Sequence, residues 1–363
     1  MVSAPSSTLA PQDHGGDARA ARERFGLAPV IDFSASINPL GTPPGLREHL
    51  FSRWDEVLHY PDRTCGACAE ALGERFGLSR DALVVGNGSA ELIGLLLRAR
   101  PWRRLLVCPP DFRLYRALAN PGTAVAEIPR LEEEGFLPDV ESLGREVRSG
   151  DLVLFSHPGN PSGAAVGAEE LLGLYRRSEA AGAVLAVDEA FADFCPEVSV
   201  LAQAGRAPGL VVLRSLTKFY GIPGLRLGFL AAPADLARTV AGLQVPWAVN
   251  TLAQAAGAYC LRQAEWEERS RACVARERAL LAQGLSGVPG ARPLPSRANY
   301  LLVRLAAPGP GAGALYDALG RRGLLVRHCG SFGLGDRYLR VAVRTGEENR
   351  QLLAAWAEAA APS

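Results

Sequence analysis

Lys218 lies in the stretch RSLTKFYGIPGLRLGFL at 214–230, directly after the apolar run LVVLRS. Such a run predicts a buried strand, so the lysine is expected where scaffold meets loop at the end of that strand. A lysine amine in this position can act as a nucleophile once it is deprotonated. A solvated loop lysine is the ordinary alternative, and only partners from elsewhere in the chain distinguish the two.

Other side chains that could bind a ligand or take part in catalysis also follow apolar runs. Asp188 ends the run AVLAVD, and Asn160 lies in the loop HPGNPSG after DLVLFS. In an open α/β sheet, ligands bind in the crevice outside the carboxyl ends of the strands. Arg226 lies eight residues after Lys218 (226 − 218). A nearby cation and partial burial favour the neutral amine that a nucleophile needs.

The stretch VVGNGSAELIGLLLRA at 84–99 predicts a strand, a Gly-Asn-Gly turn and a helix that begins at Ser89. Free backbone N–H groups at the start of a helix can bind phosphate. An ordinary strand-to-helix turn with a serine cap would give the same pattern. The chain has no GxxxxGK[ST] loop and GNGSAE does not match GxGxxG, which disfavours nucleoside triphosphate and dinucleotide binding.

The runs that carry these residues alternate with amphipathic stretches such as AEELLGLYRRSEAAG. This alternation predicts an α/β fold with a mostly parallel central sheet covered by helices. After Val249 the pattern becomes helical and then returns to strands around a predicted helix at 312–322, which indicates a smaller α+β domain. The expected divisions are a flexible tail (1–12), an extended N-terminal arm joining the small domain (13–49), a large cofactor-binding domain (50–250) and a small C-terminal domain (251–363).

Composition limits the classes of partner. A length of 363 residues suggests two domains, and 39 basic against 38 acidic side chains disfavour nucleic acid and membrane partners. The seven cysteines form no evident disulfide framework, and the CGAC at 65–68 predicts helix packing rather than a metal site. The sequence shows no signal peptide or membrane-spanning run. These features predict a cytoplasmic protein without a bound metal.

Four motifs in order, NPSG, DEA, SLTK and GLRLG, resemble those of fold-type I pyridoxal-phosphate enzymes, and the resemblance covers nearly the whole chain. It implies an aminotransferase-like fold and pyridoxal 5'-phosphate as cofactor. Lys218 would attach the cofactor covalently, and Asp188 would pair with the ring nitrogen so that the ring accepts electrons released at the substrate Cα. The cofactor contacts that the resemblance implies are Tyr60, Ser89, Ala90, Phe112, Asn160, Asp188, Ser215, Lys218 and Arg226.

The same resemblance implies a role for each of these contacts. Asn160 would contact the ring oxygen, and Phe112 in PPDFRLY would stack on the ring. Tyr60 in LHYPD would reach the phosphate of the neighbouring subunit's cofactor, which implies a homodimer. The groups implied to hold the cofactor phosphate within one subunit are Ser89, Ser215 and Arg226.

Within the family, DFSASINPLG at 32–41, Phe191 in DEAF and the segment 325–345 resemble the threonine-phosphate decarboxylases of cobalamin biosynthesis. That likeness implies decarboxylation of L-threonine O-3-phosphate to (R)-1-aminopropan-2-yl phosphate. Histidinol-phosphate aminotransferases, or related amino-acid aminotransferases, are the alternative, but the former usually carry tyrosine at the position of Phe191. The decarboxylase pattern usually reads SANINPLG, so Ser36 departs from it while Asn38 is retained.

Substrate recognition by the same likeness requires cations. Arg344 in VAVRT is matched to the family arginine that pairs with the substrate carboxylate, a bidentate contact that lysine makes poorly. The candidates for binding the substrate phosphate are His14, Arg327 and Arg340, although each could be a surface or salt-bridged side chain instead. His157 and His328 are predicted to be loop or core histidines. The expected substrate contacts are His14, Asn38, Asn160, Arg327, Arg340 and Arg344.

Two classes other than an enzyme are possible. A transcriptional regulator built on this fold would need a helix-turn-helix module, for which the segment before HGG at 14–16 is too short. A scaffold protein would have no reason to keep an asparagine, an aspartate, a lysine and an arginine all at strand ends.

Overall fold

The computed structural model describes residues 15–26 and 30–360, and the chain divides into two compact units. The large unit comprises Ile37–Arg276 and Pro295–Asn299. The small unit comprises the described parts of Met1–Ser36, Glu277–Leu294 and Tyr300–Ser363.

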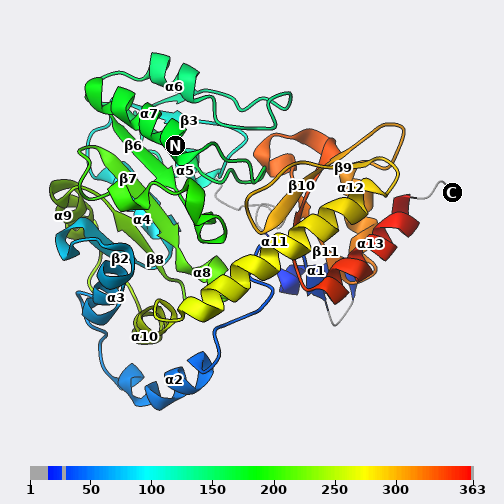
Figure 1. Ribbon diagram of the computed structural model, residues 1–363, viewed down its shortest axis with the longest axis horizontal. Coiled ribbons are helices and arrows are strands. Elements are labelled where there is room, and N and C mark those ends of the chain that lie inside the picture. Colours follow the sequence, from blue (N-terminus) through cyan, green and yellow to red (C-terminus); the bar gives the residue numbers. More distant parts are fainter. Residues whose placement is uncertain (1–14, 27–29, 361–363) are drawn as a thin grey trace, which may run out of the picture. The chain divides into compact units, whose positions relative to one another are not determined.

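The large unit is built on a seven-stranded sheet with the order β2-β8-β7-β6-β5-β3-β4 (Figure 1). The pairs from β4 to β7 are parallel, whereas β8 runs antiparallel to both of its neighbours. This arrangement confirms the predicted mostly parallel sheet. The strands are β2 (Leu83–Gly86), β3 (Arg104–Val107), β4 (Ala124–Glu127), β5 (Leu152–Ser156), β6 (Val184–Asp188), β7 (Leu210–Ser215) and β8 (Gly228–Ala231).

Helices bury the central strands of this sheet on both faces. Leu152 and Leu154 of β5 pack into a core with residues of α4 and α9, while the intervening Val153 is equally buried on the other face. Strands covered on both faces have continuous apolar sequences, which is why the runs were recognisable. The helices of this unit are α2 (Leu46–Ser52), α3 (Gly66–Phe76), α4 (Ser89–Arg98), α5 (Leu114–Ala117), α6 (Val140–Glu146), α7 (Ala168–Ala180), α8 (Leu216–Phe219), α9 (Ala234–Leu243) and α10 (Thr251–Cys260). Short 3-10 turns cover Trp54–Leu58, Arg80–Ala82, Ala192–Phe194, Pro196–Val198 and Leu201–Gln203.

The small unit combines an antiparallel four-stranded sheet, β12-β13-β10-β9, with a parallel pair, β1-β11. Its core packs strand residues such as Val303 and Leu339 against helix residues such as Trp356. α11 (Ala264–Ser286) runs from one unit into the other. The remaining elements are β1 (Ile31–Asp32), β9 (Ala291–Pro293), β10 (Tyr300–Leu305), β11 (Leu324–Leu325), β12 (Arg327–His328), β13 (Tyr338–Ala342), α1 (Ala18–Phe25), α12 (Ala312–Gly320), α13 (Gly346–Ala360) and the 3-10 turns Gly330–Phe332 and Gly335–Arg337.

The unit boundaries differ from the expected divisions in three places, because residues 37–49, 251–276 and 295–299 cluster with the large unit. α10 packs on α2 and α3, and the Tyr259 hydroxyl donates a 2.7 Å hydrogen bond to the carbonyl oxygen of Pro44. The expected extended arm also contains two helices, α1 and α2. Asp17 caps α1 by accepting a hydrogen bond from Ala20 N–H, a local signal that the sequence does contain.

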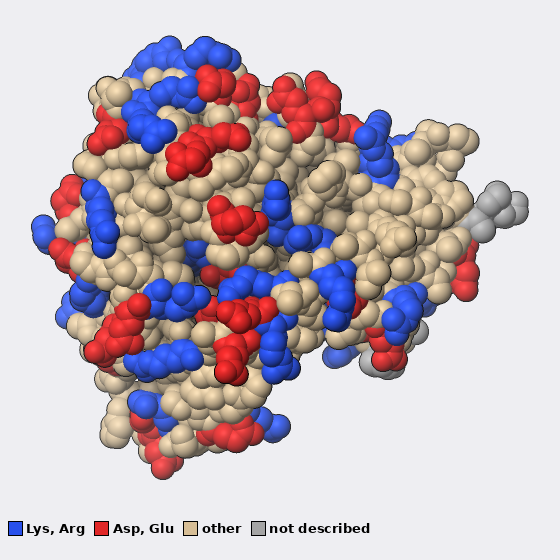
Figure 2. Space-filling view, in the orientation of Figure 1, with Lys and Arg blue, Asp and Glu red and all other residues tan. Residues whose placement is uncertain are grey.

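The placement of charged residues and cysteines agrees with the expectations from composition. On the face shown in Figure 2, acidic and basic side chains are interspersed rather than gathered by sign. All seven cysteines lie in described residues, and each is a free thiol. Cys65 precedes α3 and Cys68 is buried within it, which confirms helix packing for the CGAC stretch. In the described part of the chain, no helix combines the length and apolarity needed to cross a bilayer.

Candidate active site

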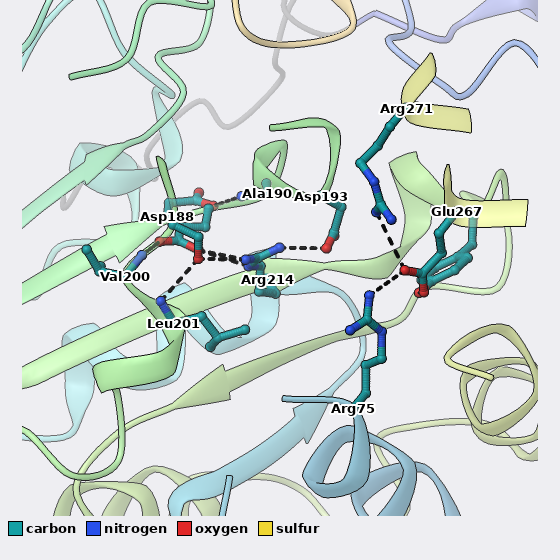
Figure 3. Close-up of polar contacts among 12 residues, drawn as sticks. Arg75, Asp188, Ala190, Asp193, Val200, Leu201, Arg214, Glu267 and Arg271 are labelled. Carbon is teal, nitrogen blue, oxygen red and sulfur yellow. Dashed lines mark hydrogen bonds and ion pairs between the residues drawn. The ribbon is translucent and has the colours of Figure 1, made fainter. Parts of the chain in front are cut away.

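Asp188 is the last residue of β6 and is buried. Its Oδ2 accepts a 2.7 Å hydrogen bond from the Tyr115 hydroxyl. Its Oδ1 accepts one of 3.1 Å from Ala190 N–H (Figure 3). Burial raises the pKa of the Asp188 carboxyl from 3.8 to about 6, although the bond from Tyr115 and the charge of Lys218 act in the opposite direction. The carboxyl is therefore held rigidly in a dry position, where a cationic ring nitrogen would favour its ionised form.

Lys218 lies in α8, the single helical turn that follows β7. Its Nζ donates a 2.9 Å hydrogen bond to Ser215 Oγ and lies 5.9 Å from the ring centroid of Phe191. It is also the only lysine in these 363 residues, since every other basic side chain counted with it is an arginine. An arginine keeps its proton and cannot serve as an amine nucleophile, so this one position retains a chemistry that the rest of the chain lacks.

The turn between β2 and α4 forms a cradle beside Arg226. Gly88 has a φ of +80°, and a Cβ there would lie 2.7 Å from the Arg226 guanidinium. A Cβ on Gly228 would likewise lie 2.7 Å from the backbone nitrogen of Ser89. Arg226 itself has a φ of 63°, which is uncommon for a residue other than glycine and brings its side chain against this turn. Close main-chain approach, a helix N-terminus and a guanidinium together form an anion site.

The observed groups fit the predicted cofactor. The N-terminus of α4 with Ser89 and Ala90, together with Ser215 and Arg226, supplies donors for a phosphate, and all of these residues belong to the large unit. Asp188 supplies the buried carboxylate that a pyridine nitrogen requires, and Lys218 supplies the amine that an aldehyde requires.

Two further predicted contacts lie on neighbouring loops of the same unit. Phe112 follows β3, and its ring meets that of Tyr115 edge-on with centroids 5.7 Å apart. Asn160 follows β5, and its backbone N–H donates a 2.8 Å hydrogen bond to Ser156 Oγ. Both loops therefore leave the sheet at the carboxyl ends of parallel strands, as predicted.

Asn38 and Tyr60 have surroundings that the sequence did not reveal. The Asn38 amide donates a 2.7 Å hydrogen bond to the carbonyl oxygen of Phe219, and its backbone N–H donates to the carbonyl oxygen of Lys218 at 3.0 Å. Asn38 thus braces the turn that carries Lys218. Tyr60 is 79% exposed and stacks on Trp247 with centroids 4.4 Å apart, so it does not join the buried group around Asp188.

In the small unit, two predicted substrate cations are cross-strand neighbours. Arg327 on β12 lies directly opposite Arg340 on β13, and both side chains are buried. Arg327 donates to Ser331 Oγ at 2.7 Å, and Arg340 donates to the carbonyl oxygen of Ser34 at 2.9 Å. Burial lowers the pKa of Arg340.

Arg344 has a different environment from the one expected of a carboxylate-binding arginine. Its guanidinium donates a 2.8 Å hydrogen bond to Glu348 and a 3.2 Å bond to the carbonyl oxygen of Asp32. Glu348 lies one helical turn later in α13, where an (i, i+4) pair forms readily. The structure therefore gives Arg344 an internal partner, Glu348.

Three of the five histidines entered the predictions. His157 is buried, its Nε2 lies 3.1 Å from the carbonyl oxygen of Val166, and burial lowers its pKa to about 3, which confirms a core histidine. His328 contacts the carboxylate of Asp336 at 3.2 Å. His14 lies outside the described residues.

A buried ion-pair network lies next to Asp188 and was not anticipated. Arg214 on β7 bonds Glu189 at 2.9 Å and Asp193 at 2.6 Å (Figure 3). The backbone N–H of Glu189 also donates a 2.8 Å bond to the carbonyl oxygen of Leu213. These contacts tie the ends of β6 and β7, and so fix the strand ends from which Asp188 and Lys218 extend.

Sequence reasoning also missed Tyr115, although the stretch that contains it was used for Phe112. The available signal was its spacing, because residues three apart on a helical turn lie on the same side. The partnership with Asp188 spans 73 positions and could not be read from local pattern.

The chain is similar in sequence and structure to known proteins. Residues 28–355 match the model of the family described as aminotransferase class I and II. The chain is 35% identical over 351 residues to the threonine-phosphate decarboxylase of Salmonella typhimurium, covering 94% of this chain and 95% of the relative. It is 32% identical over 344 residues to a histidinol-phosphate aminotransferase of Nitratidesulfovibrio vulgaris, covering 93% and 90%. The crystal structure of L-threonine-O-3-phosphate decarboxylase from Porphyromonas gingivalis superposes with a TM-score of 0.78 at 26% identity, covering 89% of this chain and 97% of that one.

Proposed function

Since the chain belongs to the aminotransferase class I and II family and its cofactor is pyridoxal 5'-phosphate, we propose that it decarboxylates L-threonine O-3-phosphate. The products would be carbon dioxide and (R)-1-aminopropan-2-yl phosphate, the aminopropanol unit of cobalamin. The proposal rests on this family membership and on two features, namely a pair of arginines in the small unit and the residue beside the lysine in the large unit.

The observation that carries the substrate class is the pairing of Arg327 with Arg340. The pair places two buried guanidinium groups on neighbouring strands, and a phosphate monoester is a dianion with the geometry that arginine binds well. His14 is a proposed third cation for the same phosphate.

The residue beside the lysine favours decarboxylation over transamination. Phe191 presents an apolar ring 5.9 Å from Lys218 Nζ, where histidinol-phosphate aminotransferases usually carry a tyrosine hydroxyl. The 35% identity to a threonine-phosphate decarboxylase over nearly the whole chain supports the same choice.

The chain's own residues would divide the work as follows. Asp188 would keep a proton on the ring nitrogen, and Asn160 and Phe112 would fix the ring oxygen and the ring plane. Bound pyridoxal phosphate supplies an electron-accepting ring that stabilises negative charge at the substrate Cα. The proposed donors to the cofactor phosphate are Ser89, Ala90, Ser215 and Arg226.

Decarboxylation breaks the bond between Cα and the carboxylate carbon, releases carbon dioxide and requires a proton at Cα. The Lys218 amine, positioned by Ser215, would deliver that proton. Asn38 and Asn160 would orient the carboxylate so that this bond, rather than Cα–H, is perpendicular to the ring. The carboxylate contact predicted for Arg344 would require substrate to displace Glu348.

A second candidate is histidinol-phosphate aminotransferase activity. The Arg327–Arg340 pair would accommodate the phosphate of histidinol phosphate equally well, and the identity to a histidinol-phosphate aminotransferase is similar at 32%. In that case Lys218 would move a proton from Cα and the carboxylate-specific contacts would serve 2-oxoglutarate instead.

The two functions are separated by their products. Purified holoenzyme is supplied with L-threonine O-3-phosphate, and separately with histidinol phosphate plus 2-oxoglutarate. The proposal expects carbon dioxide and aminopropanol phosphate from the first and no glutamate from the second. L-threonine without its phosphate is the matched control and should react poorly, because it lacks the dianion. Glutamate formation without decarboxylation would establish the aminotransferase instead.

We also propose that the protein is a homodimer. The large unit exposes several large apolar side chains, which we together call the aromatic patch; among them Tyr60 is 79% exposed and stacks on Trp247. Its members are Phe51, Trp54, Val57, Leu58, Tyr60, Val245 and Trp247. A second copy covering the patch would bury these side chains and bring Tyr60 to the neighbouring cofactor.

A further inference from the structure

A buried carboxylate, Asp111, connects the two loops that carry Phe112 and Asn160. One of its oxygens accepts hydrogen bonds from Phe112 N–H at 2.8 Å and from the Ser156 hydroxyl. The other accepts a 3.0 Å bond from Ser156 N–H. Asp111 thereby joins the loop after β3 to the last residue of β5.

Arg130 completes this connection from a third segment, after β4. Its side chain is fully buried and donates to Asp111 at 3.2 Å, to the carbonyl oxygen of Ser156 at 2.7 Å and to that of Cys108 at 3.0 Å. It lies close to Gly159, where a Cβ would come within 3.0 Å of the guanidinium. The Arg130 guanidinium therefore has several hydrogen-bond acceptors, which is the condition for a buried ion pair to be tolerated.

Ser156 relays this arrangement to the ring-contacting residue. Its hydroxyl donates to Asp111 and accepts a 2.8 Å bond from the backbone N–H of Asn160. Its position on β5 is paired with Asp188 on β6, and the next backbone N–H, from His157, donates to the Asp188 carbonyl oxygen at 2.8 Å. One chain of hydrogen bonds therefore runs from Arg130 through Asp111 and Ser156 to Asn160.

We propose that Arg130, Asp111 and Ser156 are positioning residues that fix the spacing of Phe112 and Asn160, and so the orientation of the cofactor ring. The proposal rests on the assignment of Phe112 and Asn160 as ring contacts, but not on which reaction the enzyme catalyses. Backbone N–H groups anchored to a buried carboxylate cannot shift without leaving that charge unsatisfied, so the two loops move together or not at all.

The alternative is that the network is an ordinary structural ion pair. In that case the network would contribute to folding alone, and loosening it would lower stability without a specific effect on the bound ring. The distinguishing measurements are the affinity for pyridoxal phosphate and the visible circular dichroism of the bound cofactor, which reports ring orientation. Both are made without substrate, so they are independent of the decarboxylase proposal.

The first variant is Ser156→Ala, which removes the relay and leaves the ion pair in place. Its matched control is Ser178→Ala, a buried serine of α7 whose hydroxyl donates only to the Leu174 carbonyl oxygen, at 3.0 Å. Ser156→Ala loses the bond to Asp111 and the bond from Asn160 N–H. Because the second of these positions a ring contact, we expect the Kd for pyridoxal phosphate to rise about tenfold and the visible dichroism to change. The melting temperature of the cofactor-free protein should fall as in the control, which should bind cofactor normally. Unchanged Kd and dichroism in Ser156→Ala would overturn the proposal.

A second variant keeps the test decisive if Ser156→Ala folds poorly. Arg130→Met alone should destabilise strongly, because it leaves Asp111 as an uncompensated buried charge. Adding Asp111→Asn removes that charge and should restore much of the stability. If the double variant folds but still shows raised Kd and altered dichroism, the positioning role holds. Parental cofactor binding in the folded double variant would show that the network is structural only.

Discussion

Tyr115 donates its hydroxyl hydrogen to Asp188 across 2.7 Å, and both groups are buried. Burial raises the pKa of Asp188, while this hydrogen bond lowers it. The same partnership, together with burial, raises the pKa of Tyr115 well above 10, so the phenol stays a donor throughout the working range of pH. Tyr115 therefore acts with Lys218 to keep Asp188 closer to its ionised form.

Tyr115→Phe removes this donor and should raise the pKa of Asp188 further. We expect kcat to fall about tenfold, as for loss of a hydrogen bond to a charged group, and the acid limb of the pH–rate profile to move to higher pH. The control is Tyr175→Phe, a tyrosine of α7 that interacts with Glu179. An unchanged acid limb would mean that Tyr115 only fills space.

Asp188→Asn should change how the cofactor-free protein responds to pH. Because burial raises the folded-state pKa from 3.8 to about 6, the native state binds the proton more tightly than the unfolded state. The carboxyl therefore adds stability below pH 3.8 that is lost as pH rises to about 6. We expect the free energy of unfolding of the parent, relative to the variant, to fall by about 3 kcal/mol over this window. Urea titrations at several pH values test this, and a constant difference would contradict it.

Lys218→Ala and Lys218→Arg should both abolish covalent cofactor attachment. Borohydride treatment of the parent with pyridoxal phosphate should add the cofactor mass to the peptide containing Lys218, because no other lysine is present. The arginine variant keeps the positive charge but not the nucleophile, so it separates the two contributions. Turnover at the parental rate in either variant would refute the assignment.

Arg340→Met should mainly weaken substrate binding, whereas Arg344→Met should mainly lower stability. The first removes one of the two cations proposed to bind the substrate phosphate, so we expect its main effect to be a rise in KM for threonine phosphate of about 100-fold. The second breaks the pair with Glu348 and should lower the melting temperature, with the smaller effect on KM. Comparing KM and melting temperature for both variants tests this. The reverse ranking would restore Arg344 as the main anion contact.

Leu58→Glu should dissociate the proposed homodimer. Leu58 is 80% exposed in the aromatic patch, so a charge there costs little in the isolated subunit but opposes burial against a second copy. Sedimentation should show a dimer for the parent and a monomer with weakened cofactor binding for the variant. A fully active monomer would end the proposal that Tyr60 acts across the interface.

The sequence predicted the strand ends well because each active-site residue follows an apolar run that must be buried. Asp188, Asn160 and Lys218 all lie where those runs placed them. Arg130 could not be found in this way, because its partners come from three segments brought together by the order of β4, β3 and β5. The pair between Arg344 and Glu348 was not predicted, although the glutamate four residues later was a local signal for it.

The use of arginine in place of lysine everywhere except Lys218 affects how the protein can be handled. Immobilisation on amine-reactive supports would have no harmless side chain to couple to, since the only lysine hydrogen-bonds Ser215 beside the proposed cofactor site. Coupling at that residue would block cofactor attachment. Sensor surfaces and biocatalyst beads should therefore hold the protein through an affinity tag, leaving its one side-chain amine unmodified.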